Sequence, residues 1–264
     1  MSETAARPGE RRRLRRGIYV LPSLFTMGNV FLGFLAVVSG LDGRFERAAL
    51  LVFAAGILDA LDGRLARLTH SESDFGREFD SLADVLTFCM VPALLAYLWG
   101  LRDLGRIGWL VPLFYVICGA TRLARFNIQT KVVDSRYFAG LPTPAAAGTV
   151  VAVLLFDPFA EWRTWVDVGL LIAVFLVGAL MISTFRYRSL KKFNLRRRRS
   201  YRLAVPLAAV LILVAYKPQP VLVTLAIVYT LSGPFFWVWG RLRRSRVADE
   251  PPPEAAPVDP ENAT

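Results

Sequence analysis

Residues 59–84 read DALDGRLARLTHSESDFGREFDSLAD and carry four of their aspartates in two pairs. Asp59 and Asp62 are three positions apart, and Asp80 and Asp84 are four positions apart. On an α-helix, either spacing puts both carboxylates of a pair on one face. Because a short turn separates the pairs, the stretch predicts two antiparallel helices whose acidic faces meet at one depth.

Long apolar segments extend from this stretch in both directions. Hydrophobic residues make up 55% of the 264-residue chain, and a helix needs about 20 of them in a row to cross a bilayer. The sequence therefore predicts an all-α fold, a polytopic integral membrane helical bundle with about eight transmembrane helices. The expected spans are residues 18–40, 46–67, 76–100, 106–126, 143–160, 165–185, 202–217 and 219–240.

The distribution of basic residues predicts how these helices are oriented. The net charge is +11, and most of the 32 Lys and Arg residues fall on the side of the membrane that holds the N-terminus. By the positive-inside rule, both termini are expected to be cytoplasmic. The basic charge then reflects topology and attraction to membrane lipids, and no nucleic-acid partner is expected.

Composition also divides the chain into three regions. Residues 1–16 are expected to form a basic cytoplasmic arm, residues 17–241 the membrane domain, and residues 242–264 a disordered cytoplasmic tail. In the basic run Arg186–Arg202, apolar residues interleave with cations, which indicates a short interfacial helix. Cys89 and Cys118 have no spacing that indicates a disulfide or a metal site.

Four carboxylates that face one another in a low-dielectric setting repel strongly. Divalent cations relieve this repulsion, and oxygen-only ligands favour hard ions such as Mg²⁺, Mn²⁺ or Ca²⁺. Two such ions can stabilise the attacking and leaving oxygens of a phosphoryl displacement. The alternative is a solvated helix end paired with Arg64, Arg67 and Arg77, but four aspartates at matched spacing favour metal binding. His70, in the turn, is interpreted as a loop residue rather than a base.

The stretch matches the pattern D-x2-D-G-x2-A-R-x8-G-x3-D-x3-D at every fixed position. It therefore resembles the signature of the CDP-alcohol phosphatidyltransferase family. The resemblance implies a helical membrane fold around a cytoplasm-facing site for a CDP-activated lipid. It also implies that Asp59, Asp62, Asp80 and Asp84 hold two divalent ions, and that Asp84 takes the proton from the acceptor hydroxyl. The residues implied to bind the CDP-lipid are Asp59, Asp62, Gly63, Ala66, Arg67 and Gly76.

Outside this signature, the chain resembles the membrane-embedded phosphatidylserine synthases of bacteria and archaea within the family. The matching stretches are residues 21–29, 122–127, 138–144 and 183–191, and Ser23 departs from the first of them, where Asn is expected. The resemblance implies CDP-diacylglycerol and L-serine as substrates and phosphatidylserine and CMP as products. It further implies a homodimer in the plasma (cell inner) membrane, with its active site facing the cytoplasm.

Two groups of polar residues near the site can each be interpreted in two ways. Thr26 and Asn29 share a face of the first span, where they either bond a neighbouring helix or contact the cytidine and ribose. Arg122, Arg125 and Asn127 end the fourth span at the depth of the aspartates. The arginines either extend to the membrane surface or, together with Asn127, bind serine, because arginine is the natural partner of its carboxylate.

Other functions fit parts of this pattern. The same chemistry could use glycerol phosphate, inositol phosphate or choline as the acceptor, because phosphate and carboxylate both attract arginine. A membrane transporter also carries acidic residues within its spans. Transporter sites usually lie near the bilayer midplane between repeats, whereas these acids lie toward one face and no repeat is evident.

Overall fold

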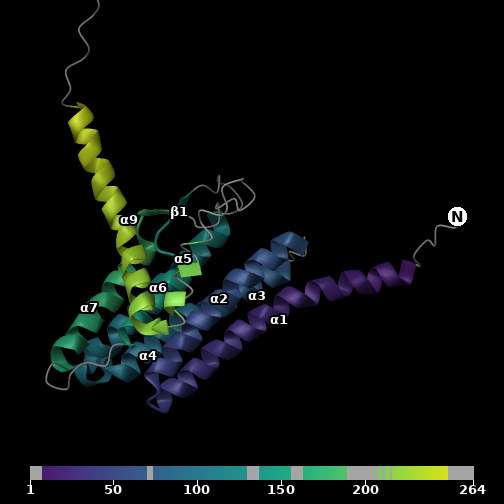
Figure 1. Cartoon of the computed structure of the whole chain (residues 1–264), viewed down its shortest axis with the longest axis horizontal. Helices are drawn as coiled ribbons and strands as arrows, with labels where there is room; N and C mark the ends of the chain where they lie inside the picture. Colours follow the sequence, from purple (N-terminus) through teal and green to yellow (C-terminus); the bar gives the residue numbers. More distant parts are fainter. Residues whose placement is uncertain are drawn as a thin grey trace, which may run out of the picture.

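The computed structural model describes residues 8–69, 74–129, 137–155, 163–188, 205, 208–209, 212–214 and 216–248. In these residues the chain is a bundle of helices with one short pair of strands. The predicted helical fold is confirmed for this part of the chain, and the strand pair is an addition to it. Figure 1 shows the helices packed side by side, while the N-terminal part of α1 (Pro8–Leu41) and the C-terminal part of α9 (Pro218–Ala248) project from the bundle.

The first acidic helix is paired tightly with the helix before it. α1 turns at Gly43 into α2 (Phe45–Thr69), and Gly43 has φ +74°, a conformation that glycine adopts without steric cost. Along the pair, a Cβ added at Gly28 of α1 would lie 2.8 Å from Leu58 Cδ2 of α2. Small residues allow such close approach between membrane helices. This packing holds α2 against α1 at the level of the acidic residues.

The second acidic helix begins a longer rod. α3 (Asp74–Asp84) passes into a π-helical segment, η1 (Val85–Met90), and then into α4 (Val91–Trp99). A short 3-10 turn, η2 (Leu101–Leu104), leads to α5 (Gly105–Gln129), which packs back against the rod. α6 (Thr143–Val153) and α7 (Arg163–Ile182) complete the bundle, and α9 packs against α6. The buried core consists mainly of small and branched side chains, among them Ala48, Ala96, Ala147, Val150 and Val174.

Two short strands join distant parts of the sequence. β1 (Tyr137–Ala139), which precedes α6, pairs antiparallel with β2 (Arg186–Arg188), which follows α7. The expected interfacial helix Arg186–Arg202 therefore does not begin at Arg186, because the backbone there is extended and paired with β1. Residues 189–202 lie outside the described residues.

The backbone beyond the strands extends this connection. The Gly140 N–H donates to the Phe185 carbonyl oxygen at 2.9 Å, and the Leu141 N–H donates to the Leu180 carbonyl oxygen at 3.1 Å. Gly140 has φ +83° and lies so close to the Met181 carbonyl oxygen that a side chain would collide with it. The start of α6 is thus fixed to the end of α7.

The boundaries expected for the N-terminal arm and the C-terminal tail both fall inside helices. α1 starts at Pro8, so it includes most of the expected arm at residues 1–16. α9 continues to Ala248, past the expected start of the tail at residue 242. Residues 1–7 and 249–264 lie outside the described residues.

The described residues contain four helical stretches that are long and apolar enough to cross a membrane. These stretches are Leu24–Leu41, Phe75–Trp99, Leu101–Ile128 and Trp165–Ile182, and α6 is a shorter apolar helix. The expected spans at residues 46–67 and 219–240 correspond to the helices α2 and α9. A membrane protein is therefore supported, while the count of eight spans stays a prediction.

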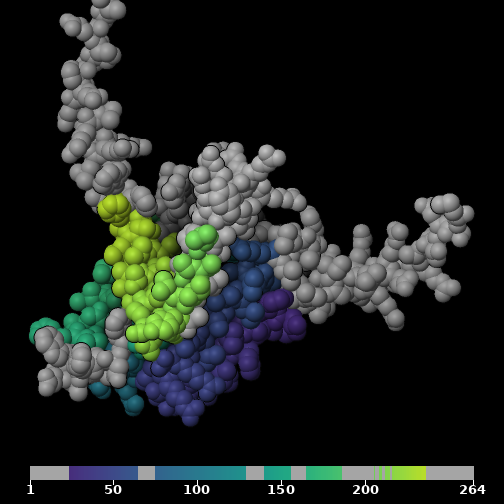
Figure 2. Space-filling model, viewed as in Figure 1, coloured from purple at the N-terminus to yellow at the C-terminus, as the bar shows by residue number. Residues whose placement is uncertain are grey.

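The outer surface of the bundle agrees with a lipid setting. Large apolar side chains recur along one exposed face of α1, and Phe34 in this row is 68% exposed. Hydrocarbon chains can cover such a face without the free-energy cost that contact with water carries. Figure 2 shows part of α9, in yellow-green, beside the N-terminal helices, in purple to blue. The Gln219 side-chain amide donates to a Glu46 carboxylate oxygen at 2.9 Å, which links α9 to α2.

Candidate active site

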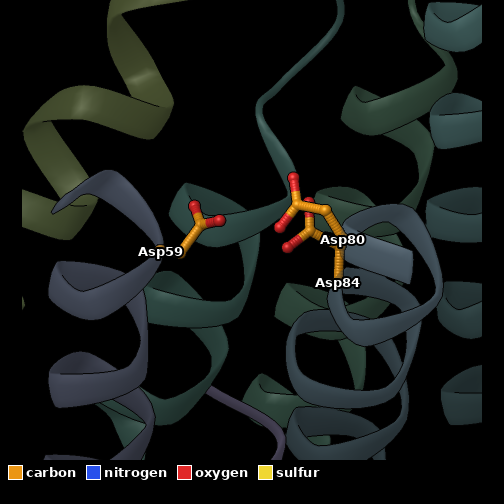
Figure 3. A group of neighbouring side chains, drawn as sticks. All are labelled: Asp59, Asp80 and Asp84. Carbon is orange, nitrogen blue, oxygen red and sulfur yellow. The ribbon is translucent and has the colours of Figure 1, made fainter. Parts of the chain in front are cut away.

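Three carboxylates from two neighbouring helices lie together. Asp59 belongs to α2, and Asp80 and Asp84 lie one turn apart on α3. One carboxylate oxygen from each residue lies within 4.8 Å of the others, and all three residues are half-buried. Figure 3 shows Asp59 pointing from its helix toward Asp80 and Asp84. The facing arrangement that the spacing predicts is present for these three aspartates.

The geometry of this carboxylate cluster fits a divalent cation. Mg²⁺ and Ca²⁺ bind carboxylate oxygens at about 2.0–2.6 Å, so two ligands of one ion lie at most about 5 Å apart. The separations of up to 4.8 Å between Asp59, Asp80 and Asp84 fall within this limit. All three donors are oxygens, which hard cations prefer. Without positive charge beside them, three carboxylates at this distance would repel one another strongly.

Asp62 is close in sequence but lies outside this cluster of three. Its side chain is only 6% exposed, and the Thr26 hydroxyl of α1 donates to its Oδ2 at 2.8 Å. Its Oδ1 is buried and has no hydrogen-bond partner among the described residues. A buried carboxylate oxygen without a partner is costly, so Oδ1 is an atom that could still bind a ligand. Thr26 acts here as a contact between helices, one of the two interpretations of this residue.

Asn29 lies one turn beyond Thr26 and has a different environment. Its side chain is 1% exposed, and neither its amide nitrogen nor its amide oxygen has a partner among the described residues. The Thr87 hydroxyl bonds the backbone carbonyl of Asn29 at 3.4 Å and leaves the amide unused. Buried amides normally find partners, so Asn29 presents both a donor and an acceptor in the interior beside η1.

Two glycines of the signature flank the carboxylates in sequence, Gly63 one turn after Asp59 and Gly76 one turn before Asp80. Gly63 is exposed on α2, and no described atom lies within 4 Å of the position that a Cβ would take there. A glycine inside a helix costs about 1 kcal/mol relative to alanine, and the packing of the described residues does not explain that cost. Gly76 is half-buried in the first turns of α3. The side chains of Ala66 and Arg67, and all of His70, lie outside the described residues.

Arg122 is a basic residue of α5 that interacts with the carboxylate cluster. Its guanidinium is largely buried and interacts electrostatically with the Asp84 carboxylate and with Tyr229 of α9. One terminal nitrogen (Nη1) lies 3.5 Å from the Thr143 hydroxyl oxygen, while Nε is buried without a partner in the described part of the chain. Arginine carries five donors, so Arg122 can still bind an anionic group beside Asp84.

The other two residues at the end of α5 are placed differently. Arg125 is exposed, one turn from Arg122. The Asn127 amide donates to the Ser81 hydroxyl oxygen at 2.9 Å, and Ser81 in turn donates to the Arg77 carbonyl oxygen at 2.9 Å. Asn127 therefore connects α5 to the turn of α3 between Asp80 and Asp84.

Sequence reasoning did not identify three residues that surround these groups. Ser81 bonds Asn127, Thr143 lies within 3.5 Å of Arg122 Nη1, and Tyr229 interacts electrostatically with Arg122. Thr143 falls within the matching stretch 138–144, which could have indicated it. Nothing in the sequence pattern brings Tyr229 of α9 to the end of α5, because that contact depends on how the helices pack.

Comparisons with known proteins agree with the resemblance found in the sequence. The family model described as CDP-alcohol phosphatidyltransferase matches residues 19–175. A CDP-diacylglycerol–serine O-phosphatidyltransferase of Helicobacter pylori is 41% identical over 227 residues, which cover 84% of this chain and 92% of the relative. The enzyme of the same name from Bacillus subtilis is 37% identical over 65% of this chain and 92% of its own length. An archaetidylserine synthase of Methanothermobacter thermautotrophicus is 37% identical over 63% of this chain and 69% of the relative.

Proposed function

Because the chain belongs to the CDP-alcohol phosphatidyltransferase family, we propose that it transfers the phosphatidyl group of CDP-diacylglycerol to the hydroxyl of L-serine. The products are phosphatidylserine and CMP. The observation that carries the proposal is the cluster of Asp59, Asp80 and Asp84 at the family signature. The relatives that the chain matches over most of its length are named for this reaction.

The aspartates hold the divalent ions in this proposal. Asp59, Asp80 and Asp84 supply one group of ligands, and Asp62 adds its buried Oδ1 beside them. The family pattern implies two divalent ions, and the oxygen ligands favour Mg²⁺ or Mn²⁺. Ions bound there would supply positive charge that stabilises the pyrophosphate and the departing CMP. Thr26 orients Asp62 through the hydrogen bond to its Oδ2.

The acceptor is bound between α3 and α5. Arg122 offers its buried Nε, which has no partner among the described residues, to the serine carboxylate. Serine bound in this way has its hydroxyl near Asp84, which interacts electrostatically with Arg122. Asp84 takes the proton as the serine oxygen forms a bond to the lipid phosphorus, and the bond from phosphorus to CMP breaks. Asn127 bonds Ser81 and so holds the turn of α3 that carries Asp84. Arg125 is exposed, so we assign the serine carboxylate to Arg122 rather than to Arg125.

The CDP group lies along α2 and α1. No described atom fills the space beside Gly63, which permits close approach of the nucleotide or its pyrophosphate, and Ala66, Arg67 and Gly76 of the signature contribute to the same binding site. The unused amide of Asn29 offers a donor and an acceptor to the polar part of the lipid substrate, and Thr26 lies beside it. Arginine suits the pyrophosphate because its planar group makes paired hydrogen bonds to phosphate oxygens.

The membrane setting follows from the charge distribution and the family. We place the membrane domain at residues 17–241 between a basic arm and a C-terminal tail at residues 242–264, with both termini in the cytoplasm. The site then opens to the cytoplasm of the plasma membrane, where soluble serine and CMP exchange while the lipids stay in the bilayer. A homodimer is part of this proposal by resemblance to the family.

The test is a reconstituted assay on the purified full-length chain. The protein is incubated with CDP-diacylglycerol, Mn²⁺ or Mg²⁺ and labelled L-serine, and labelled lipid and released CMP are measured. Asp59→Asn is compared with Asp42→Asn, which changes an exposed aspartate in the turn between α1 and α2. Metal-dependent phosphatidylserine from the wild type and from Asp42→Asn, but not from Asp59→Asn, supports the proposal.

Two other outcomes of this assay contradict parts of the proposal. CMP released only with glycerol phosphate, inositol phosphate or choline would keep the phosphatidyl transfer and refute serine as the acceptor. No CMP release with any of these alcohols would refute the transfer itself.

A further inference from the structure

The helix that carries Asp80 and Asp84 changes its winding immediately after Asp84. Residues Val85–Met90 form the π-helical segment η1, and the Val91 N–H bonds the carbonyl of Leu86, five residues back. A π turn holds one more residue than an α turn, and one residue of an α-helix corresponds to about 100° of rotation. The rotation of Asp80 and Asp84 relative to α4 is therefore set by this segment.

A proline, Pro92, follows two residues after the π segment ends at Met90. In a regular α-helix the Phe88 carbonyl would accept a hydrogen bond from the N–H of residue 92, but Pro92 has none. The Tyr115 hydroxyl of α5 donates to this carbonyl oxygen instead, at 2.9 Å. Tyr115 is 0% exposed, so its hydroxyl has no access to solvent. A side chain thus donates to a carbonyl that residue 92 cannot serve.

α5 lies against the π segment over more than this one contact. One turn beyond Tyr115, Gly119 lies so close to the Cys89 thiol that a Cβ would collide with its sulfur. Phe88 and Cys89 are themselves fully buried. α5 therefore fits the π segment at two specific positions. Tyr115 supplies a hydroxyl, and Gly119, one turn later, has no side chain that would collide with Cys89.

We infer that Tyr115 is a positioning residue for the carboxylate cluster. By holding the Phe88 carbonyl, it keeps the π turn in place and fixes the rotation at which Asp80 and Asp84 face Asp59. If the turn relaxed to α-helix while α4 kept its packing, the two aspartates would rotate by about 100° away from Asp59. The inference rests on the proposed function, because it takes these carboxylates as the ligands of divalent ions.

The variant that tests this is Tyr115→Phe, which keeps the ring and removes the hydroxyl. Tyr97→Phe is the matched control, since Tyr97 is a half-buried tyrosine of α4 that lies outside the cluster. Both are made in the full-length chain in lipid nanodiscs. Mn²⁺ binding without substrates is measured by electron paramagnetic resonance, alongside the Mn²⁺ dependence of phosphatidylserine synthesis, the KM for CDP-diacylglycerol and the thermal midpoint.

For Tyr115→Phe we expect the Mn²⁺ concentration for half-saturation to rise about tenfold, as for other residues that orient metal ligands. The KM for CDP-diacylglycerol at saturating Mn²⁺ should stay close to that of Tyr97→Phe. Unchanged Mn²⁺ affinity overturns the inference, even if the thermal midpoint falls, because the tyrosine would then serve packing alone. A wild-type protein that binds no Mn²⁺ would refute the proposed metal site instead, so the two failures are distinguishable.

Discussion

Replacing Arg122 with glutamine tests which arginine recognises the acceptor. Glutamine keeps a polar side chain of moderate length but loses the positive charge and the paired donors. In the structure, Arg122 is largely buried beside Asp84 and has a buried nitrogen without a partner among the described residues. Arg125, one turn on, is exposed. The two residues are equivalent in the sequence pattern, so the structure alone distinguishes them.

The expected loss follows from the hydrogen bonds that Arg122 would make to the serine carboxylate. Hydrogen bonds to charged groups contribute about 1.5–3 kcal/mol. Since each 1.36 kcal/mol is a factor of ten, kcat/KM for serine should fall about 10- to 150-fold in Arg122→Gln. The KM for CDP-diacylglycerol should change much less, because the nucleotide lies along α1 and α2 in the proposal.

The assay measures the initial rate of phosphatidylserine formation against serine concentration at saturating CDP-diacylglycerol and Mn²⁺. Arg125→Gln is measured in parallel, and Arg102→Gln, an exposed change in η2 at the other end of α5, is the control for loss of charge. A fall in kcat/KM for serine in Arg125→Gln, with Arg122→Gln unaffected, would refute the reasoning from burial.

The remaining predictions concern the carboxylates and the helix that carries them. Asp84→Asn should abolish turnover while CDP-diacylglycerol still binds, and near-normal turnover would show that Asp84 is not the base. Thr26→Val removes the bond to a buried carboxylate and should lower the free energy of unfolding by about 1.5–3 kcal/mol. Thr224→Val, which removes only an exposed intrahelical bond, should change it little, and equal thermal midpoints for the two variants would contradict this. Gly63→Ala should stabilise α2 by up to about 1 kcal/mol and raise the KM for CDP-diacylglycerol, so an unchanged KM would exclude close approach of the substrate there. Chelation of divalent ions should stop the reaction and added Mn²⁺ should restore it, whereas activity that persists in chelator would exclude metal dependence.

The meeting of the acidic helices could be predicted because it depends on spacing. Asp80 and Asp84 share a face in any α-helix, and a short turn brings Asp59 opposite them. The position of Asp62 could not be predicted in this way. Its spacing from Asp59 places it on the same face, but the hydroxyl of Thr26 on α1 holds its carboxylate. That contact depends on how closely α1 and α2 pack, which the sequence pattern does not specify.

Two backbone features also escaped prediction, for the same physical reason. The π segment depends on Tyr115 of α5 meeting the Phe88 carbonyl, and Pro92 alone indicates only that one donor is missing. The β1–β2 pair is made by main-chain groups, which every sequence carries, so side-chain patterns give little sign of it. The run from Arg186 accordingly resembled an amphipathic helix.

The strand pair has a consequence for which substitutions the chain can accept. A clasp closes the open end of the α6–α7 hairpin, and it consists of β1, β2 and the backbone bonds from Gly140 and Leu141. Thr143, the partner of Arg122, follows two residues after Leu141. Main-chain bonds persist through most exchanges of side chain, but a proline removes the donor on which each depends. The side chains of β1 and β2 can therefore change among related proteins while the Thr143 hydroxyl stays in the same position. The conditions are that no proline enters the strands and that Gly140 remains glycine.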